Sequence, residues 1–315
     1  MIDNALQLYN FNNPNAALIR HNENMTYKIT DGTKSYVMRI HKPVEGFNLD
    51  LLRLNIDKTD LIIDEMKILQ FLDSRGYLST QKVKHSTSGK SVALLDDKAP
   101  VTALNWIEGV TIENIDLTPE IAFNLGIMIG KLHNALTQFT PKNRYHYDSA
   151  LLLRMINEAS KALIQKHFTK QQAKTIIDTL LCIKEYLSHT EDRFIIVHTD
   201  LGKSNIIHQN NILIPIDFSL SGYCIPEMDL ASAFAHINAD ALNQEILKGY
   251  ESISKHKLDN IGINICFCLQ ILLFIICQHN KFASESWFQD NLIRWCDTYF
   301  TPLISQQYQL FLHPK

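Results

Sequence analysis

The stretch IIVHTDLGKSNII, residues 195–207, decides how this chain folds and where its chemistry lies. Two apolar runs flank a polar loop in which His198, Asp200 and Asn205 have the spacing H-x-D-x-x-x-x-N. Short apolar runs that are bounded by polar residues predict buried strands. The sequence therefore predicts a loop that presents a carboxylate and an amide from the end of a short strand.

A second acidic position follows in ILIPIDFS, residues 212–219, where Asp217 comes after another apolar run. The oxygen atoms of Asp200, Asn205 and Asp217 are the hard ligands that Mg²⁺ prefers, with phosphate and water completing its coordination. Each of these residues taken alone is a common turn residue. As an ordered set at the ends of two strands, they predict a site for Mg²⁺ and a triphosphate.

These two segments, together with GYCIPEMDLA at residues 222–231, resemble the catalytic loop, metal loop and closing signature of aminoglycoside phosphotransferase and choline kinase-like enzymes. The resemblance covers nearly the whole chain and is strongest over residues 194–233. It implies an α+β, bilobal protein-kinase-like fold: a small lobe, residues 1–107, with an antiparallel sheet and one main helix, and a larger, mostly helical lobe, residues 108–315.

The same resemblance implies a phosphotransferase that uses Mg²⁺ and ATP, with GTP as the alternative donor. The γ-phosphoryl group would pass to a hydroxyl of a small molecule, such as an aminoglycoside-, choline- or homoserine-like acceptor. Asp200 would orient the acceptor hydroxyl, and most of its contribution would come from positioning. Asn205 and Asp217 would hold the metal, and Lys203 would contact the γ-phosphate. His198 would brace the loop, with a direct role as a general base as the less favoured alternative.

Several positions depart from the family pattern. Gly202 and Lys203 stand where relatives often have histidine and proline, and Leu220 stands where many have a second acidic residue. The loss at Leu220 suggests either a single dominant metal site or a different acceptor contact. Asp229 is expected to be a buried helix-start carboxylate that ties the catalytic loop down, and His133 is expected to be a structural core histidine.

In the N-terminal part, residues 60–72 have the apolar period of a helix, and Glu65 falls in the centre of its apolar face. A carboxylate there needs a partner. Arg39 is the natural one, because it lies on a predicted strand over residues 35–41, on the same face as Val37. By resemblance this pair grips the α- and β-phosphates, with arginine where many relatives have lysine; the alternative is a surface ion pair on a small sheet.

The nucleotide contacts expected from the resemblance lie in two further segments. The loop at residues 21–24 would cover the phosphates without any glycine, and Asn24 is assigned to the nucleotide, with a plain turn as the alternative. The apolar segment 101–109 would be the hinge between the lobes, where backbone groups read the adenine edge. Its contact residues would be Leu104, Asn105, Trp106 and Ile107; the alternative is an ordinary edge strand.

From Thr118 onward the pattern is helical. Thr118 and Pro119 have the character of a cap and a first-turn proline. Apart from the helix that they begin, the sequence predicts helices over residues 147–166, 169–188, 227–239, 241–252, 258–278 and 287–300.

Composition narrows the possible partners. The chain has 315 residues and a net charge of −3, which does not suggest binding to nucleic acid or to an anionic membrane. Six scattered cysteines without a C-x-x-C pair favour reduced thiols in a cytoplasmic protein. We expect no signal peptide, a buried helix rather than a membrane span in the uncharged run 261–277, and a monomer or dimer.

Two other functions compete with the small-molecule kinase. A protein Ser/Thr kinase is disfavoured because residues 218–225 leave no room for a long activation segment before Pro226-Glu227. A nucleotide-binding regulator without turnover is supported only by the departures at Arg39 and Leu220. A polycationic aminoglycoside acceptor would need an acidic cleft in the larger lobe, for which the candidates are Asp148, Glu158, Asp229 and Asp240.

Overall fold

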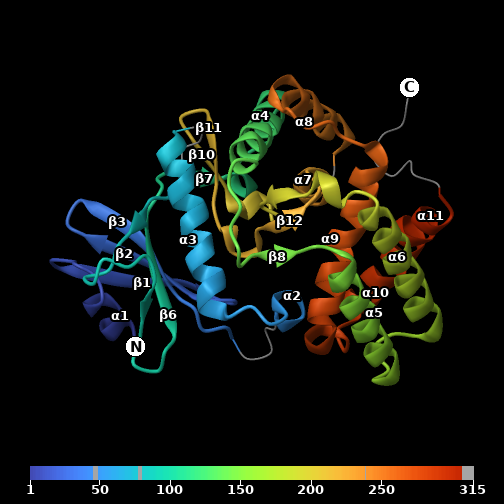
Figure 1. The fold of residues 1–315 in the computed structure, drawn as a ribbon, viewed down its shortest axis with the longest axis horizontal. Helices are drawn as coiled ribbons and strands as arrows, with labels where there is room; N and C mark the ends of the chain where they lie inside the picture. Colours follow the sequence, from blue (N-terminus) through green and yellow to red (C-terminus); the bar gives the residue numbers. More distant parts are fainter. Residues whose placement is uncertain (45–48, 77–79, 238, 307–315) are drawn as a thin grey trace.

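A twisted sheet lies at one end of the molecule and a group of helices at the other, with a long helix between them (Figure 1). This computed structural model describes residues 1–44, 49–76, 80–237 and 239–306. The predicted α+β architecture, with an antiparallel sheet first and helices afterwards, is confirmed.

The N-terminal sheet is antiparallel and runs β1-β2-β3-β6-β4, with β5 also paired to β6. Its strands are β1 (Pro14–His21), β2 (Met25–Asp31), β3 (Lys34–Ile40), β4 (Val83–Lys84), β5 (Ala93–Leu94) and β6 (Pro100–Asn105). The predicted strand over 35–41 is therefore β3, and the strand expected over 101–109 ends at Asn105.

The two faces of this sheet have different partners. Met38 and Ile40 pack in a cluster with the short helix α1 (Ile2–Gln7) on one face. The register places Val37 opposite Leu104 and Arg39 opposite Thr102, so these side chains share the other face. That second face is directed toward the long helix and the rest of the chain, and Leu104 packs against that helix.

Helix α3 (Lys58–Arg75) is longer than the predicted 60–72 because its two ends are capped. The Asp57 side chain accepts hydrogen bonds from the backbone N–H groups of Thr59 and Asp60. At the other end Gly76 adopts a left-handed conformation with φ +61°, which glycine does without steric cost. A short helix, α2 (Asp50–Arg53), precedes α3.

The C-terminal part contains the helices that the sequence predicted, with small shifts at their ends. The Thr118 hydroxyl accepts a hydrogen bond from Ile121 N–H, which confirms the predicted cap. The expected helix over 287–300 becomes α-helical only to Trp295 and continues as a π-helical turn, Cys296–Phe300. The expected helix over 227–239 includes Asn238, which lies outside the described residues. The helices are α4 (Pro119–Leu136), α5 (Ser149–Ile164), α6 (Lys170–Ser188), α7 (Glu227–Ile237), α8 (Asp240–Ile253), α9 (Asn260–Phe282), α10 (Ser286–Trp295) and α11 (Thr301–Ile304).

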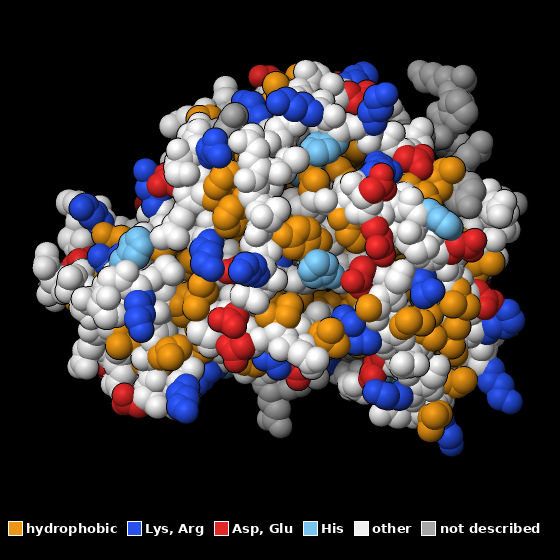
Figure 2. Space-filling view, viewed as in Figure 1, with side chains coloured by type: hydrophobic (Ala, Val, Ile, Leu, Met, Phe, Trp, Pro, Cys, Tyr) orange, Lys and Arg blue, Asp and Glu red, His pale blue; other side chains and the backbone are white. Residues whose placement is uncertain are grey.

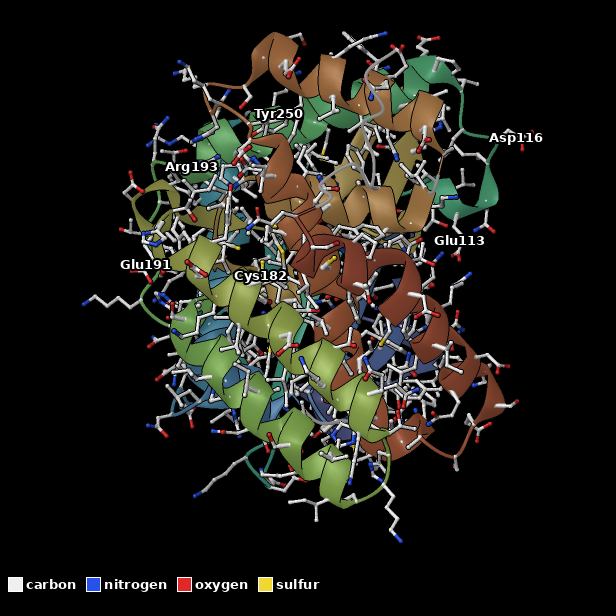
Figure 3. The ribbon with its side chains drawn as sticks, turned by 90° about the vertical axis from the view of Figure 1, so that its right-hand side faces the viewer. Glu113, Asp116, Cys182, Glu191, Arg193 and Tyr250 are labelled. Atoms are coloured by element: carbon white, nitrogen blue, oxygen red, sulfur yellow. The ribbon has the colours of Figure 1, made fainter. Side chains whose placement is uncertain are left out.

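Helix α9 is the one helix in the described part of the chain that is long and apolar enough to cross a membrane. About two thirds of its most apolar window, 67%, is buried inside the protein, as expected of a core helix. Its cysteines Cys266 and Cys268 are buried, and all six cysteines of the chain are free thiols. Figure 3 shows Cys182 on α6, in the layer that α6 forms with α5.

Two small sheets form the junction between these parts. One has the order β8-β12-β9 and the other β11-β10-β7. The predicted strands around the polar loops are present as β9, β10 and β11. The bounds are β7 (Val110–Thr111), β8 (Tyr145–His146), β9 (Ile195–Val197), β10 (Ile206–Gln209), β11 (Ile212–Pro215) and β12 (Gly222–Cys224).

Arg144 joins α3 to the loop after β11, a role that the sequence analysis missed. Its guanidinium is buried and donates to four backbone carbonyl oxygens: Leu61 at 2.8 Å, Phe218 at 2.9 Å, Ser219 at 2.7 Å and Ser221 at 2.8 Å. Because each of these bonds has a charged donor, the group fixes the position of the loop relative to α3.

We expect Arg144→Met to lower the free energy of unfolding by about 3–5 kcal/mol, because it leaves buried carbonyl oxygens without donors. Urea denaturation of the purified chain measures this. The matched control is Lys142→Met, which removes an exposed cation two residues away and is expected to have little effect. Equal stabilities for the two variants would contradict the role of Arg144.

Candidate active site

Asp217 lies directly after β11, at the start of a short turn, Phe218–Leu220. Its backbone is left-handed, with φ 67° and ψ 69°, a conformation that aspartate tolerates better than most residues. Arg20 donates from Nη2 to Oδ2 of Asp217 at 2.7 Å, and Nη1 of Arg39 lies 3.3 Å from Oδ1. Burial opposes ionisation, but these two guanidinium groups hold the pKa of Asp217 at about 2.

This carboxylate has the properties of a metal ligand. It is ionised at neutral pH, it is buried, and its Oδ1 atom accepts no hydrogen bond within the described part of the chain. Arg39 forms an ion pair with this oxygen without a hydrogen bond, so a lone pair stays free, which is unusual for a buried oxygen. A bound cation would use this lone pair, so Mg²⁺ fits the donor set.

Asp200 and Asn205 lie in one loop and contact each other. Nδ2 of Asn205 donates to Oδ2 of Asp200 at 2.8 Å and to the Asp200 carbonyl oxygen at 3.0 Å. Because the amide nitrogen is directed to Asp200, the side-chain oxygen of Asn205 is the atom that a cation would take. Burial raises the pKa of Asp200; nearby His198 opposes the rise and Asp217 adds to it.

A buried carboxylate holds the backbone of this loop in place. Asp229, on α7, accepts hydrogen bonds from the N–H of His198 at 2.9 Å and of Thr199 at 2.6 Å. Thr199 has a positive φ of 67°, so these bonds stabilise a strained turn. Nε2 of His133 lies 2.9 Å from Oδ2 of Asp229, and its Nδ1 lies 2.9 Å from the hydroxyl of Tyr250. The predicted positions of Asp229 and His133 are confirmed.

His198 braces the loop rather than facing a reacting group. Its Nε2 donates to the Ile216 carbonyl oxygen at 3.0 Å, and its Nδ1 lies 3.3 Å from the N–H of Asp200. Ile216 in turn donates its N–H to the Asn205 carbonyl oxygen at 2.9 Å. The catalytic loop and the metal loop are therefore joined through one imidazole, as the sequence analysis expected.

The structure contains the predicted ion pair between β3 and α3. Nη1 of Arg39 donates to Oε1 of Glu65 at 2.9 Å, and both side chains are buried. Because Arg39 also approaches Asp217, one guanidinium connects the sheet, the helix and the metal loop. The pair is thus not a surface ion pair, and its contact with phosphate stays a prediction.

Glu23, in the loop between β1 and β2, was missed by the sequence analysis. Ser219 Oγ donates to its Oε2 at 3.3 Å, so this loop reaches the metal loop. Burial, together with the charges of Asp217 and Glu65, raises the pKa of Glu23 to about 7. Its neighbour Asn24 is buried beside the same site. In the sequence Glu23 is a single acidic residue in a polar turn, and such residues are too common to indicate a functional site.

This pKa predicts a pH-dependent stability. Between the ordinary glutamate pKa of about 4.3 and 7, the folded chain binds more protons at Glu23 than the unfolded chain, so stability falls as pH rises. We expect Glu23→Gln to be more stable than the unchanged chain at pH 8 by about 1–2 kcal/mol, or a few degrees in Tm, and to lose this advantage at pH 4.5. Thermal unfolding at both pH values measures it.

The control is Glu113→Gln, because Glu113 is exposed and lies at the edge of the molecule, on the right in Figure 3. Its effect on Tm is expected to be the same at both pH values. A pH-independent effect of Glu23→Gln would show that Glu23 does not titrate in this range.

The remaining sequence-predicted residues lie at the ends of the site. Asn105 donates its N–H to the Lys82 carbonyl oxygen and Trp106 donates to that of Ser35, both at 2.9 Å. These two backbone amides of the predicted hinge are therefore already hydrogen-bonded within the N-terminal part of the chain. The Trp106 ring lies 4.2 Å from Nζ of Lys28. Lys203 is half-buried on the turn Lys203–Asn205.

Two cavities adjoin this group of residues. One, of about 510 Å³, is lined by Glu23, Asn24, Glu65 and Arg144 among others. The other, of about 540 Å³, opens at Asp200 and extends along α9. Both have the size of small-molecule sites. On the face shown in Figure 2, acidic and basic side chains are mixed rather than gathered in one patch.

The sequence of this chain matches a known protein family. The profile of a family described as "Phosphotransferase enzyme family" matches residues 16–259. No curated protein sequence gave a match.

Three solved kinase structures have the same fold. A microcompartment-associated aminopropanol kinase is 17% identical, with 99% of this chain and 98% of that chain covered and a TM-score of 0.78. An amicoumacin kinase in complex with AMP-PNP and Ca²⁺ is 18% identical, with 97% and 92% covered and a TM-score of 0.75. A choline kinase from Cryptosporidium parvum is 12% identical, with 94% and 90% covered and a TM-score of 0.62. At these identities the similarity shows the fold.

Proposed function

Because this chain belongs to the phosphotransferase enzyme family, we propose that it transfers the γ-phosphoryl group of Mg²⁺-bound ATP to a hydroxyl of a small molecule. The observation that carries the proposal is that Asp200, Asn205 and Asp217 lie close together beside the Arg39–Glu65 pair. Phosphoryl transfer depends mainly on positioning and on charge stabilisation, and this site offers groups for both.

The surroundings of Asp200 support a catalytic role for its carboxylate. Its carboxylate borders the cavity along α9, so an acceptor hydroxyl placed there would donate a hydrogen bond to it. Asn205 fixes the carboxylate through Oδ2, and the raised pKa of Asp200 makes it a better proton acceptor late in the transfer. Lys203, on the same loop, is proposed to contact the γ-phosphate.

Asp217 and the side-chain oxygen of Asn205 would hold Mg²⁺, which neutralises charge on the phosphoryl group. Arg39 is proposed to contact the α- and β-phosphates while Glu65 holds it in place. Its two buried carboxylate partners, Glu65 and Asp217, keep the guanidinium fixed before any ligand arrives.

The nucleotide is proposed to lie between the lobes formed by residues 1–107 and 108–315. Val37 would contact the base from β3, Asn24 would contact the phosphates, and Ile107 would offer its amide to the adenine edge. Asn105 and Trp106 would then shape the end of the sheet rather than donate their own amides. The free thiols of all six cysteines support a cytoplasmic location.

A thermal-shift screen followed by an ADP-release assay tests this function. We expect Mg·ATP to raise Tm more than Mg²⁺ alone or ATP with EDTA does, because a ligand that binds only the folded chain stabilises it by mass action. The same screen with Mg·GTP shows whether ATP or GTP is the preferred phosphoryl donor. ADP release that depends on a hydroxyl-bearing acceptor distinguishes turnover from regulatory nucleotide binding; no stabilisation by either Mg·nucleotide would contradict the proposal.

A further inference from the structure

The cavity that opens at Asp200, called the acceptor cavity below, is built on one face of α9. Phe267, Gln270, Ile271 and Phe274 line it at helical spacing. Trp295 and Tyr299 also line it and pack beside the rings of α9. Its floor includes Leu220, at the position where the sequence analysis noted the loss of an acidic residue. The cavity is therefore the place where a bound molecule could bring a hydroxyl to Asp200.

Aromatic rings form much of the wall of the acceptor cavity. The rings of Phe267 and Tyr299 pack edge to face with centroids 4.9 Å apart, and those of Phe274 and Trp295 do so at 6.0 Å. Such contacts hold the rings in fixed orientations. Gln270 is also fixed, because its Nε2 donates to the Thr199 carbonyl oxygen at 2.6 Å, which leaves less of its polar surface for a ligand.

The charges at the acceptor cavity do not suit a polycation. Among the described residues that line it, Asp200 is the one carboxylate and Arg294 the one lysine or arginine. Arg294 donates to Oδ1 of Asn291 at 2.6 Å, and no ion pair is seen for it within the described chain. A guanidinium without a carboxylate partner repels a cationic ligand. Asp200 does not offset this repulsion, because its carboxylate is needed to accept the hydrogen bond of the acceptor hydroxyl.

The acidic residues that the sequence analysis proposed for an aminoglycoside cleft lie elsewhere. Asp148 caps α5 through the N–H groups of two residues of that helix. Glu158 is paired with Lys161, and Asp229 is buried under the catalytic loop. Asp240 starts α8 and is not among the residues around the cavity. The expectation of an acidic cleft assembled from these residues is not met.

We propose that the acceptor is an alcohol with a mostly apolar body that contains rings, and that it is neutral or carries one anionic group directed to Arg294. The inference rests on the proposed function for the meaning of Asp200, and it adds the acceptor class. The aromatic wall supplies apolar contact area, and a volume of about 540 Å³ accommodates a molecule of drug size. The lining residues that the structure describes include no carboxylate other than Asp200 that could pair with an amine.

The binding test uses the full-length chain without nucleotide and 1-anilinonaphthalene-8-sulfonate, a fluorescent aromatic monoanion, as the ligand. We expect saturable binding that Phe274→Ser weakens by about tenfold, through lost ring contact, and that Arg294→Gln weakens by about three- to tenfold. Phe274 is 38% exposed, so the substitution removes less buried apolar surface than one at a core position would. Kanamycin, a polycation, and choline, a monocation, are expected not to displace the dye.

The matched controls come from the same helices. Ile261→Ser removes an apolar side chain that is 37% exposed on α9, and Ile293→Ser removes one that is 54% exposed beside Arg294; neither residue lines the cavity. Both control variants are expected to bind the dye as the unchanged chain does. No saturable binding, equal binding by Phe274→Ser and the unchanged chain, or displacement by kanamycin would overturn the inference.

Because nucleotide is absent from this titration, its outcome is separate from that of the proposed function. If the chain binds the dye as expected but gains no stability from Mg·nucleotide, the cavity assignment is supported and the proposed kinase activity is contradicted. If the chain phosphorylates kanamycin with a micromolar KM, the proposed kinase activity is supported and the proposed acceptor class is contradicted.

Discussion

Asp200→Asn is expected to lower kcat for phosphoryl transfer by about 10³-fold while leaving the affinity for Mg·ATP within about threefold. The substitution preserves the size of the side chain but removes the acceptor for the substrate proton and the negative charge that aligns the hydroxyl. ADP release under saturating acceptor, or with water as the acceptor where the alcohol is not identified, measures kcat. Calorimetry with Mg·AMP-PNP measures the affinity.

The loop geometry makes this variant informative. Asp229 and His198 hold the loop backbone through contacts in which the side chain of Asp200 takes no part, so the loop is expected to keep its shape. An unchanged kcat would remove Asp200 from the catalytic role. A parallel loss of nucleotide affinity would indicate instead that the site had been disturbed.

Asp217→Asn is expected to weaken binding of Mg·AMP-PNP by about 100-fold or more, because it removes the charged ligand of the metal. The amide is nearly the same size as the carboxylate, but it leaves Arg20 and Arg39 facing a neutral group. Isothermal titration calorimetry measures the affinity. Binding as tight as that of the unchanged chain would contradict the metal assignment.

The control for Asp217→Asn is the same titration with AMP-PNP in the presence of EDTA. If Asp217 acts through the metal, the variant and the unchanged chain bind the metal-free nucleotide with similar affinity. Denaturation of both chains in urea checks that the variant remains folded under the conditions of the titration. A similar loss with and without the metal would point to a general disturbance of the site.

The sequence was sufficient to predict the position of a residue where that position follows from local spacing. Asp200 and Asp217 follow short apolar runs and Asn205 directly precedes one, and those runs are strands in the structure. Glu65 sits at the centre of an apolar helical face, which required a partner and led to Arg39. In each case one periodic pattern carried the information.

The sequence was insufficient where contacts join distant loops. Arg20, Glu23 and Arg144 lie in or beside turns without a period, and each of them contacts the metal loop across at least 74 positions of the chain. The acceptor cavity was hidden for a different reason. Nearly every residue over 261–277 is apolar, so the pattern could not tell which face of the helix packs in the core and which lines a cavity.

The two guanidinium groups at Asp217 have a consequence for how the metal enters. The carboxylate already has counter-ions in Arg20 and Arg39, so an incoming divalent ion must take over an occupied electrostatic position. A bare ion would separate Arg20 and Arg39 from Asp217 without giving them new anionic partners. An ion that is already chelated by phosphates brings anionic groups with which the two arginines pair. We therefore expect the metal and the nucleotide to bind as one complex. The triphosphate would then select the cation, because the two associate in solution before they bind to the protein.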